Sequence, residues 1–198
     1  MESIRTSLHC YSPQIVSDAN VTRYASVALL LRPGDDGPEV LFIQRASHPN
    51  DPWSGNLGFP GGRIDPEDSD PLAAAVRETA EEVGIILTPE QLLGQLDDYH
   101  GIRVPVLVSC YVFAVDKKQP IQANEEVERT FWMSLNTLRQ VERHATRKVD
   151  WHGNLTEVPS IHIDEISPVL WGLTYRFIYR FFSIIGTPLA ECTTEPIL

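Results

Sequence analysis

Three glutamates lie close together in the sequence, at Glu78, Glu81 and Glu82. In a helix, spacings of three and four residues place side chains on one face, so we expect these carboxylates to be neighbours. Like charges at that separation repel, and a hard divalent cation such as Mg²⁺ would relieve the repulsion because it prefers carboxylate oxygen. The alternative interpretation is a solvated helix face in which Arg77 pairs with Glu81.

The segment that carries these acids has the start and stop signals of a helix. Asp70 is a suitable N-cap, Pro71 suits the first helical position, and Gly84 suits the end. The glycines Gly61 and Gly62 come before it, where the backbone can bend or approach a ligand without a Cβ in the way. The residues expected to form the buried stripe, opposite the acids, are Leu72, Val76, Thr79, Ala80 and Val83.

The glycine pair and the segment Arg77-Glu78-Thr79-Ala80-Glu81-Glu82-Val83-Gly84-Ile85 together resemble the Nudix box. The second half of that pattern matches closely, with Thr79 in an apolar position. The first half is one residue longer than the pattern between Gly62 and Arg77. Where the pattern has a glutamate, this chain offers Glu67, Asp68, Ser69 and Asp70, so the residue that takes this position stays open.

The resemblance extends to the coenzyme A diphosphatase branch of that family. The similar features are Phe59-Pro60-Gly61-Gly62, the spacing of Asp65, Asp68 and Asp70, Ala74-Ala75 before Arg77, and Trp171-Gly172-Leu173-Thr174. The loop before the box departs from the branch, because Gly55 fits but Asp51 stands where the branch has an arginine. Another diphosphate, such as ADP-ribose, a dinucleotide or a nucleoside triphosphate, therefore stays open as the substrate.

The resemblance implies a diphosphatase that cleaves CoA or a CoA derivative to 4′-phosphopantetheine and 3′,5′-ADP, with Mg²⁺ or Mn²⁺ bound by Glu78, Glu81 and Glu82. Arg77 is expected to orient one of these carboxylates and not to contact substrate. Glu126, just before an expected strand, is the candidate general base or further ligand. A nucleotide-binding protein without activity is a third hypothesis, disfavoured because binding alone does not need three repelling carboxylates.

Basic side chains at strand ends or beside the glycine pair are candidates for binding substrate phosphates. The candidate substrate-binding residues are Arg45, Arg63, Arg103, Gly61 and Gly62. The alternative for each arginine is a surface salt bridge. Aromatic residues belong more often to the core than to a stacking site for adenine, but three are candidates for stacking: Trp53, Trp132 and Trp171.

The hydrophobic pattern predicts the elements that position these residues. Strands are expected over 24–31, 40–45, 92–96, 104–115, 127–132 and 158–163, and further helices over 136–143 and 168–185. The expected fold class is α/β, with a mixed sheet between helices in a Nudix-type α/β/α sandwich. The expected divisions are a peripheral arm without clean periodicity over 1–22, the Nudix hydrolase domain over 23–186, and a tail over 187–198.

The composition narrows the classes of partner that the protein is expected to bind. The 198 residues include 16 Lys and Arg against 27 Asp and Glu, a net charge of −11, which disfavours nucleic acid and anionic membranes as partners. The three cysteines are scattered, which argues against a disulfide framework or a thiolate zinc site and favours the cytoplasm. We expect no signal peptide or membrane span, and a small nucleotide-diphosphate substrate as the partner. A homodimer stays a hypothesis for the oligomeric state.

Overall fold

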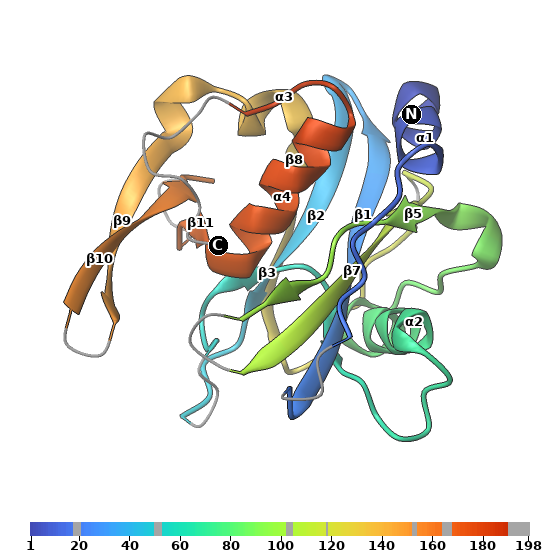
Figure 1. Cartoon of the computed structure of the whole chain (residues 1–198). Helices are drawn as coiled ribbons and strands as arrows, with labels where there is room; N and C mark the ends of the chain where they lie inside the picture. The colour runs from blue at the N-terminus through green and yellow to red at the C-terminus, as the bar shows by residue number, and fades with distance from the viewer. Residues whose placement is uncertain are drawn as a thin grey trace.

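A computed structural model describes residues 1–17, 21–49, 53–101, 105–117, 119–151, 154–163 and 168–189. The strands of the larger sheet are β1 (Arg23–Gly34), β2 (Gly37–Arg45), β3 (Leu57–Gly58), β4 (Gly61–Arg63), β5 (Leu92–Gln95), β6 (Tyr99–His100), β7 (Val106–Ala114) and β8 (Val127–Ser134). The strands of the smaller sheet are β9 (His144–Trp151), β10 (Asn154–Ile161) and β11 (Leu170–Trp171). The helices are α1 (Glu2–His9), α2 (Pro71–Val83), α3 (Leu135–Leu138) and α4 (Gly172–Ile184), with 3-10 turns at Pro89–Gln91 and Val141–Arg143 (Figure 1).

The larger sheet is mixed, as predicted: β1 runs parallel to β7 and antiparallel to β2. β1 and β2 pair only where the hairpin joins them, from Leu31 opposite Val40 to the turn. Beyond that point the two strands separate, and β4 pairs with the freed edge of β1 while β3 pairs with that of β2. The chain between β3 and β4 therefore crosses the opening between two long strands, which brings the glycine pair to the middle of the sheet.

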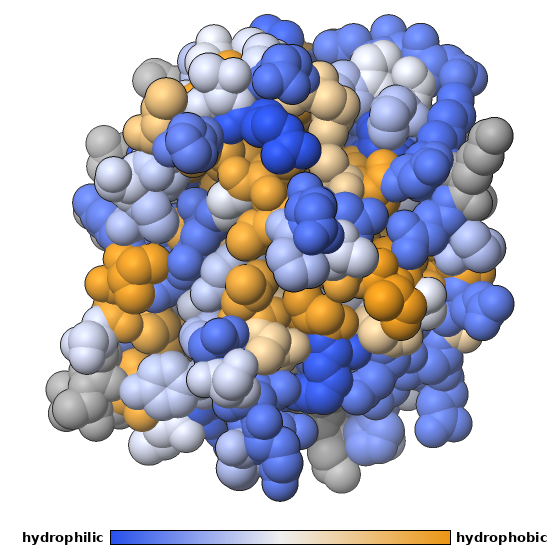
Figure 2. All heavy atoms as spheres, turned by 90° about the vertical axis from the view of Figure 1, so that its right-hand side faces the viewer, coloured by the Kyte–Doolittle hydropathy of each residue, from blue (hydrophilic) through white to orange (hydrophobic). Residues whose placement is uncertain are grey.

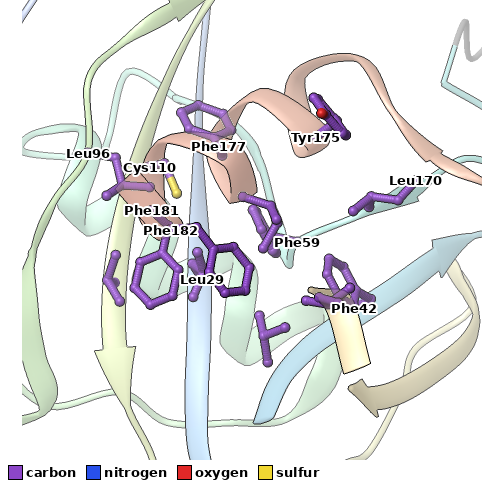
Figure 3. Packing of buried hydrophobic residues seen from close by; sticks show 14 of the residues in the cluster. Leu29, Phe42, Phe59, Leu96, Cys110, Leu170, Tyr175, Phe177, Phe181 and Phe182 are labelled. Atoms are coloured by element: carbon purple, nitrogen blue, oxygen red, sulfur yellow. The ribbon is translucent and has the colours of Figure 1, made fainter. Parts of the chain in front are cut away.

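Alternating residues of β1 face two different cores. Leu29 and Leu31 pack in the larger cluster with residues of α1 and α4, whereas Ala28 and Leu30 pack in the second cluster with residues of α2. Phe181 belongs to the α4 side of the larger cluster, as Figure 3 shows. The sheet thus lies between helices on both faces, which confirms the predicted α/β/α sandwich.

The N-terminal residues contain a helix that the sequence pattern did not predict. In α1 the side chains of Ile4 and Leu8 are buried against the sheet, and Leu8 lies beside Gly94 of β5. Two apolar residues in a helix of eight are too few to establish a periodicity. Within the arm expected over 1–22, the structure thus places a helix at Glu2–His9, which is stabilised by packing on β5.

The second half of the chain also differs from the prediction. The helix expected over 136–143 is divided into α3 and a 3-10 turn, and β9 follows where no strand was predicted. β9 pairs along its length with β10, which begins at Asn154 instead of 158. The final helix starts at Gly172 because Leu170 and Trp171 pair with β10 as β11. The polar residues of β9 give no strand pattern in the sequence. The strand forms because its partner strand supplies the backbone hydrogen bonds.

The surface on the side of α1 and α2 is largely hydrophilic, with apolar patches between the polar side chains (Figure 2). In the part of the chain that the structure describes, no helix is long and apolar enough to cross a bilayer. Among the described cysteines, Cys110 is buried in β7 and Cys10 is exposed, and neither forms a disulfide.

Asp97 ties the segment after α1 to the C-terminal helix. Its side chain is 6% exposed, accepts hydrogen bonds from the Tyr11 hydroxyl and from the Gln14 amide at 2.8 Å, and pairs with Arg180 Nε at 2.7 Å. We predict that Asp97→Ala lowers the free energy of unfolding by about 3 kcal/mol, because it leaves these donors without their acceptor. Denaturant titration measures this, with exposed Glu142→Ala as a control that changes stability by less than about 0.5 kcal/mol. Equal effects of the two variants would contradict the prediction.

Candidate active site

The glycine pair allows α2 to lie against β4. Gly61 and Gly62 pair with Val27 and Ser26 of β1. Gly61 has a φ of +148°, and a Cβ there would lie 2.3 Å from the carbonyl oxygen of Ser26. A Cβ on Gly62 would lie 2.5 Å from the carboxyl carbon of Glu78. Only glycine at both positions leaves room for the strand edge on one side and the glutamate on the other.

Helix α2 forms as the sequence predicts. The Asp70 side chain caps it by accepting from the Ala73 amide at 2.8 Å, Pro71 is its first residue, and Gly84 ends it in the left-handed conformation with a φ of +70°. Of the predicted stripe, Thr79 and Val83 are buried, while Leu72, Val76 and Ala80 are partly buried. The helix presents Glu78 and Glu82 to β4.

The three glutamates differ in burial. Glu82 is 2% exposed, and its Oε2 accepts a hydrogen bond from the Gly61 amide at 2.8 Å. Its Oε1 lies 3.6 Å from Nη1 of Arg45. Burial raises the pKa of the Glu82 carboxyl to about 7, against the opposing effects of the Gly61 hydrogen bond and Arg45. Glu81, by contrast, is exposed.

The burial of Glu78 is intermediate between that of Glu82 and that of Glu81. Its Oε1 accepts from Nη1 of Arg77 at 2.9 Å, and burial raises the pKa of its carboxyl although the neighbouring guanidinium lowers it. The same Arg77 nitrogen donates to Glu81 Oε2 at 3.2 Å. The i,i+4 pair of Arg77 and Glu81, which belongs to the alternative interpretation of a solvated face, is therefore present, and the same guanidinium also pairs with Glu78.

Arg77 is held entirely within the protein. Its Nε and Nη2 donate to the two carboxylate oxygens of Asp68 at 3.0 and 2.9 Å, and Nη2 also donates to the Arg63 carbonyl at 3.1 Å. With Glu78 and Glu81, these contacts supply an acceptor for each of the five guanidinium N–H groups. The Arg77 hydrogen bonds lower the pKa of Asp68. Asp68 is thus the residue of the extended acidic stretch that binds the box arginine, a position that the sequence left open.

The loop before β8 brings Glu126 to the end of α2, near Glu82. The Asn124 amide donates to the Glu82 carbonyl at 3.0 Å, and the Asn124 side-chain oxygen accepts from the Glu126 amide at 2.9 Å. The Glu126 carbonyl accepts from the Ala46 amide at 2.8 Å, just after β2. The exposed Glu126 carboxylate contributes to raising the pKa of both Glu78 and Glu82, so the structure brings these three acids together.

Sequence reasoning missed Asn124, which connects the end of α2 to the loop that carries Glu126. An asparagine two residues before a charged residue at a strand start is a turn signal that would have indicated it. Arg45 lies beside Glu82, and Arg63 contributes its carbonyl to Arg77 while its side chain is exposed. Arg103 and Asp51 lie outside the described residues.

The candidate stacking residues are spread over the molecule. Trp132 lies under the Arg32 guanidinium, 4.2 Å from the ring centre, and its indole nitrogen is buried. Trp53 is 38% exposed. The Trp171 Nε1 donates to Asn56 Oδ1 at 3.2 Å, next to the end of β2. Of the three, Trp171 is far from the box in the sequence but contacts a residue next to the end of β2.

The acids of the site have the chemistry to hold a divalent cation but are not arranged around one. In the described residues, no three His, Cys, Asp or Glu side chains form a ready coordination cluster, and arginines hold Glu78, Glu81 and Glu82 instead. The charge of Glu126 contributes to raising the pKa of Glu78 and of Glu82, and the charge of Glu78 contributes to raising that of Glu82, a repulsion that a cation would reverse. Carboxylate oxygen is the donor type that Mg²⁺ and Mn²⁺ prefer, so the donor set fits these ions.

The chain is similar in sequence to known proteins. The chain is 31% identical over 141 residues to mitochondrial coenzyme A diphosphatase NUDT8 of Mus musculus, covering 69% of this chain and 66% of that protein. It is 31% identical over 180 residues to the uncharacterized Nudix hydrolase NudL of Salmonella heidelberg (strain SL476), covering 88% of each. The chain spans 45% of the length of the human NUDT8 protein that it also matches.

A solved structure of a MutT/nudix family protein from Enterococcus faecalis has the same fold. Its TM-score is 0.61 at 19% identity, covering 94% of this chain and 70% of that chain. The family model described as the NUDIX domain matches residues 22–156, which include the glycine pair, all of α2 and Glu126. From this match and the bacterial relative, we conclude that the chain belongs to the Nudix hydrolase family.

Proposed function

We propose that this protein is a diphosphatase, dependent on Mg²⁺ or Mn²⁺, that cleaves CoA or a CoA derivative to 4′-phosphopantetheine and 3′,5′-ADP. The observation that carries the proposal is the convergence of Glu78, Glu82 and Glu126 beside the glycine pair, from two separate parts of the chain. The preference for CoA rests on the branch motifs in the sequence and on the name of the mouse relative.

In this proposal each residue has a distinct role. Glu78, Glu81 and Glu82 would hold the divalent cation, which neutralises diphosphate charge and lowers the pKa of water. Gly61 positions Glu82 through its amide, and Arg77 positions Glu78. Glu126 would accept the proton of the attacking water or serve as a further ligand.

The phosphates would be received at the glycine pair and its basic neighbours. Gly61 and Gly62 present backbone without side chains, so a charged group can approach closely. Arg45 and Arg63 would donate to phosphate oxygens, Arg45 by exchanging its contact with Glu82. ADP-ribose, a dinucleotide or a nucleoside triphosphate is the second candidate substrate, favoured by Asp51 in the place of the branch arginine.

Substrate identity is tested by incubating the protein with Mg²⁺ and, separately, with CoA, ADP-ribose, NADH and a nucleoside triphosphate, and by identifying products by mass. We expect 4′-phosphopantetheine and 3′,5′-ADP from CoA. Glu82→Gln should reduce the rate by at least about 100-fold, because it removes a charged ligand, whereas exposed Glu142→Gln should leave it unchanged. Cleavage only of another diphosphate would overturn the substrate, and no metal-dependent cleavage would favour the nucleotide-binding hypothesis.

The close approach of Gly62 to Glu78 gives a second prediction. Gly62→Ala should preserve the fold, because the group that its Cβ meets is the movable end of a side chain, but should displace the Glu78 carboxylate. We expect kcat to fall by about 100-fold, since a displacement of about 1 Å at a catalytic group can cost that much. The matched control is Gly58→Ala, whose Cβ meets nothing within 4 Å. Equal kcat values for the two variants would contradict the role of Gly62.

The raised pKa of Glu82 gives a third prediction, for the protein in the presence of a chelator. The unfolded chain loses the Glu82 proton near pH 4.5 and the folded protein near pH 7, so the folded state binds more protons in between. The wild type should therefore lose about 3 kcal/mol of stability relative to Glu82→Gln as the pH rises from 4.5 to 8. Urea unfolding at several pH values measures this difference. A difference that stays constant with pH would show that Glu82 titrates normally.

A further inference from the structure

The row of the larger sheet that contains Gly62 carries two serines on the face that α2 covers. Gly62 of β4 pairs with Ser26 of β1, and Ser26 pairs with Ser109 of β7. Ala28 and Leu30 pack in the cluster of α2, so Ser26 points to the same face of the sheet, because side chains alternate along a strand. Both serines are buried. A buried hydroxyl is costly unless it is hydrogen-bonded, so the partners of these two groups indicate what they do.

The two serines differ in their hydrogen bonds. The Ser109 hydroxyl donates to Asp98 Oδ1 at 2.7 Å, as expected of a buried hydroxyl. The Ser26 hydroxyl is buried as well but has no hydrogen-bond partner among the described residues. The contacts of the fold therefore give the Ser26 hydroxyl no stabilising role. Because solvent does not reach this oxygen, the partner that it can gain is a neighbouring group of the protein.

Glu78 supplies a matching acceptor beside Ser26. A Cβ on Gly62 would lie 2.5 Å from the carboxyl carbon of Glu78 and 2.6 Å from each of its oxygens, so the carboxylate occupies the place of a side chain at position 62. Side chains opposite each other on antiparallel strands have Cβ atoms roughly 5 Å apart, which makes this carboxylate the cross-strand neighbour of Ser26. Its Oε1 accepts from Arg77 at 2.9 Å, whereas its Oε2 accepts no hydrogen bond from the described residues. A donor without an acceptor thus lies next to an acceptor without a donor.

We propose that Ser26 is a positioning residue of the site, whose hydroxyl donates a hydrogen bond to Oε2 of Glu78 when that carboxylate binds the divalent cation. The proposal rests on the proposed function, which makes Glu78 a cation ligand. A cation repels the neighbouring guanidinium, which weakens the hold of Arg77 on Glu78. The Ser26 hydroxyl is neutral, so it orients the carboxylate without repelling the cation. Carboxylates that bind metals are themselves hydrogen-bonded, and loss of such a partner costs roughly 10- to 100-fold in metal affinity.

The test measures Mn²⁺ binding by calorimetry, which needs neither substrate nor turnover. The binding assigned to the site is the component that Glu82→Gln removes, since the chain carries other exposed acids. We expect Ser26→Ala to weaken this binding about tenfold. Ser26→Cys, which keeps a similar shape but offers only a weak donor, should give a similar loss.

Unfolding in the presence of a chelator separates positioning from packing. Ser26→Ala should have a urea midpoint at or above that of the wild type, because the variant removes a buried hydroxyl that has no partner. The matched control is Ser109→Ala, in the same row of the sheet. Its midpoint should fall, because Asp98 loses a hydrogen bond, while its affinity for Mn²⁺ should equal that of the wild type. A lower midpoint for Ser26→Ala would show that this hydroxyl stabilises the fold, and would overturn the positioning role.

Mn²⁺ binding also separates a failure of this proposal from a failure of the proposed function. Equal affinities of the wild type and Ser26→Ala would overturn the role of Ser26 and leave the proposed function standing. A tenfold loss in Ser26→Ala, in a protein that cleaves none of the diphosphates, would support the role of Ser26 and overturn only the proposed function. A wild type that binds no Mn²⁺ at this site would overturn both.

Discussion

The contact between the Glu82 carboxylate and the Gly61 amide is the interaction around which the site is built. It holds α2 beside β4, where a Cβ on Gly61 would collide with β1 and a Cβ on Gly62 would displace the Glu78 carboxylate. It also requires a carboxyl group to be buried, which disfavours its charge and raises its pKa to about 7. A group with a pKa near neutrality, held by the backbone, changes charge readily when a cation approaches.

Arginine side chains offset the negative charge of the glutamates at the place where the cation would lie. Arg77 uses all of its N–H groups within the protein and fixes Glu78 relative to Asp68, so the extended loop before α2 is part of the site. Arg45 compensates Glu82 at a longer distance of 3.6 Å, which is easier to exchange. The two arginines thus differ: Arg77 is fixed by five contacts within the protein, whereas in the proposed function Arg45 would exchange its contact with Glu82 for a substrate phosphate.

At the end of β2 the two faces of the larger sheet carry different side chains. The α2 face carries the acids, the opposite face carries Arg129 beside Phe131, and Arg147 of the smaller sheet lies over Trp171. The register shift at Arg45 makes this division possible, because a regular pairing would have turned either Arg129 or Val127 to the wrong face. β9, which the sequence pattern did not predict over 144–151, belongs to the smaller sheet. Arg147 is in β9, and Trp171 is in β11.

The sequence by itself determined the local features of this protein. Asp70, Pro71 and Gly84 specify the limits of α2, and the spacing of Glu78, Glu81 and Glu82 with Arg77 indicates both the family and its acidic helix, since these signals depend only on neighbours along the chain. Tertiary structure decided what depends on distant partners. It buried Glu82, selected Asp68 for Arg77, brought Glu126 to α2, and formed α1 and β9, because burial and strand pairing are set by residues far away in sequence.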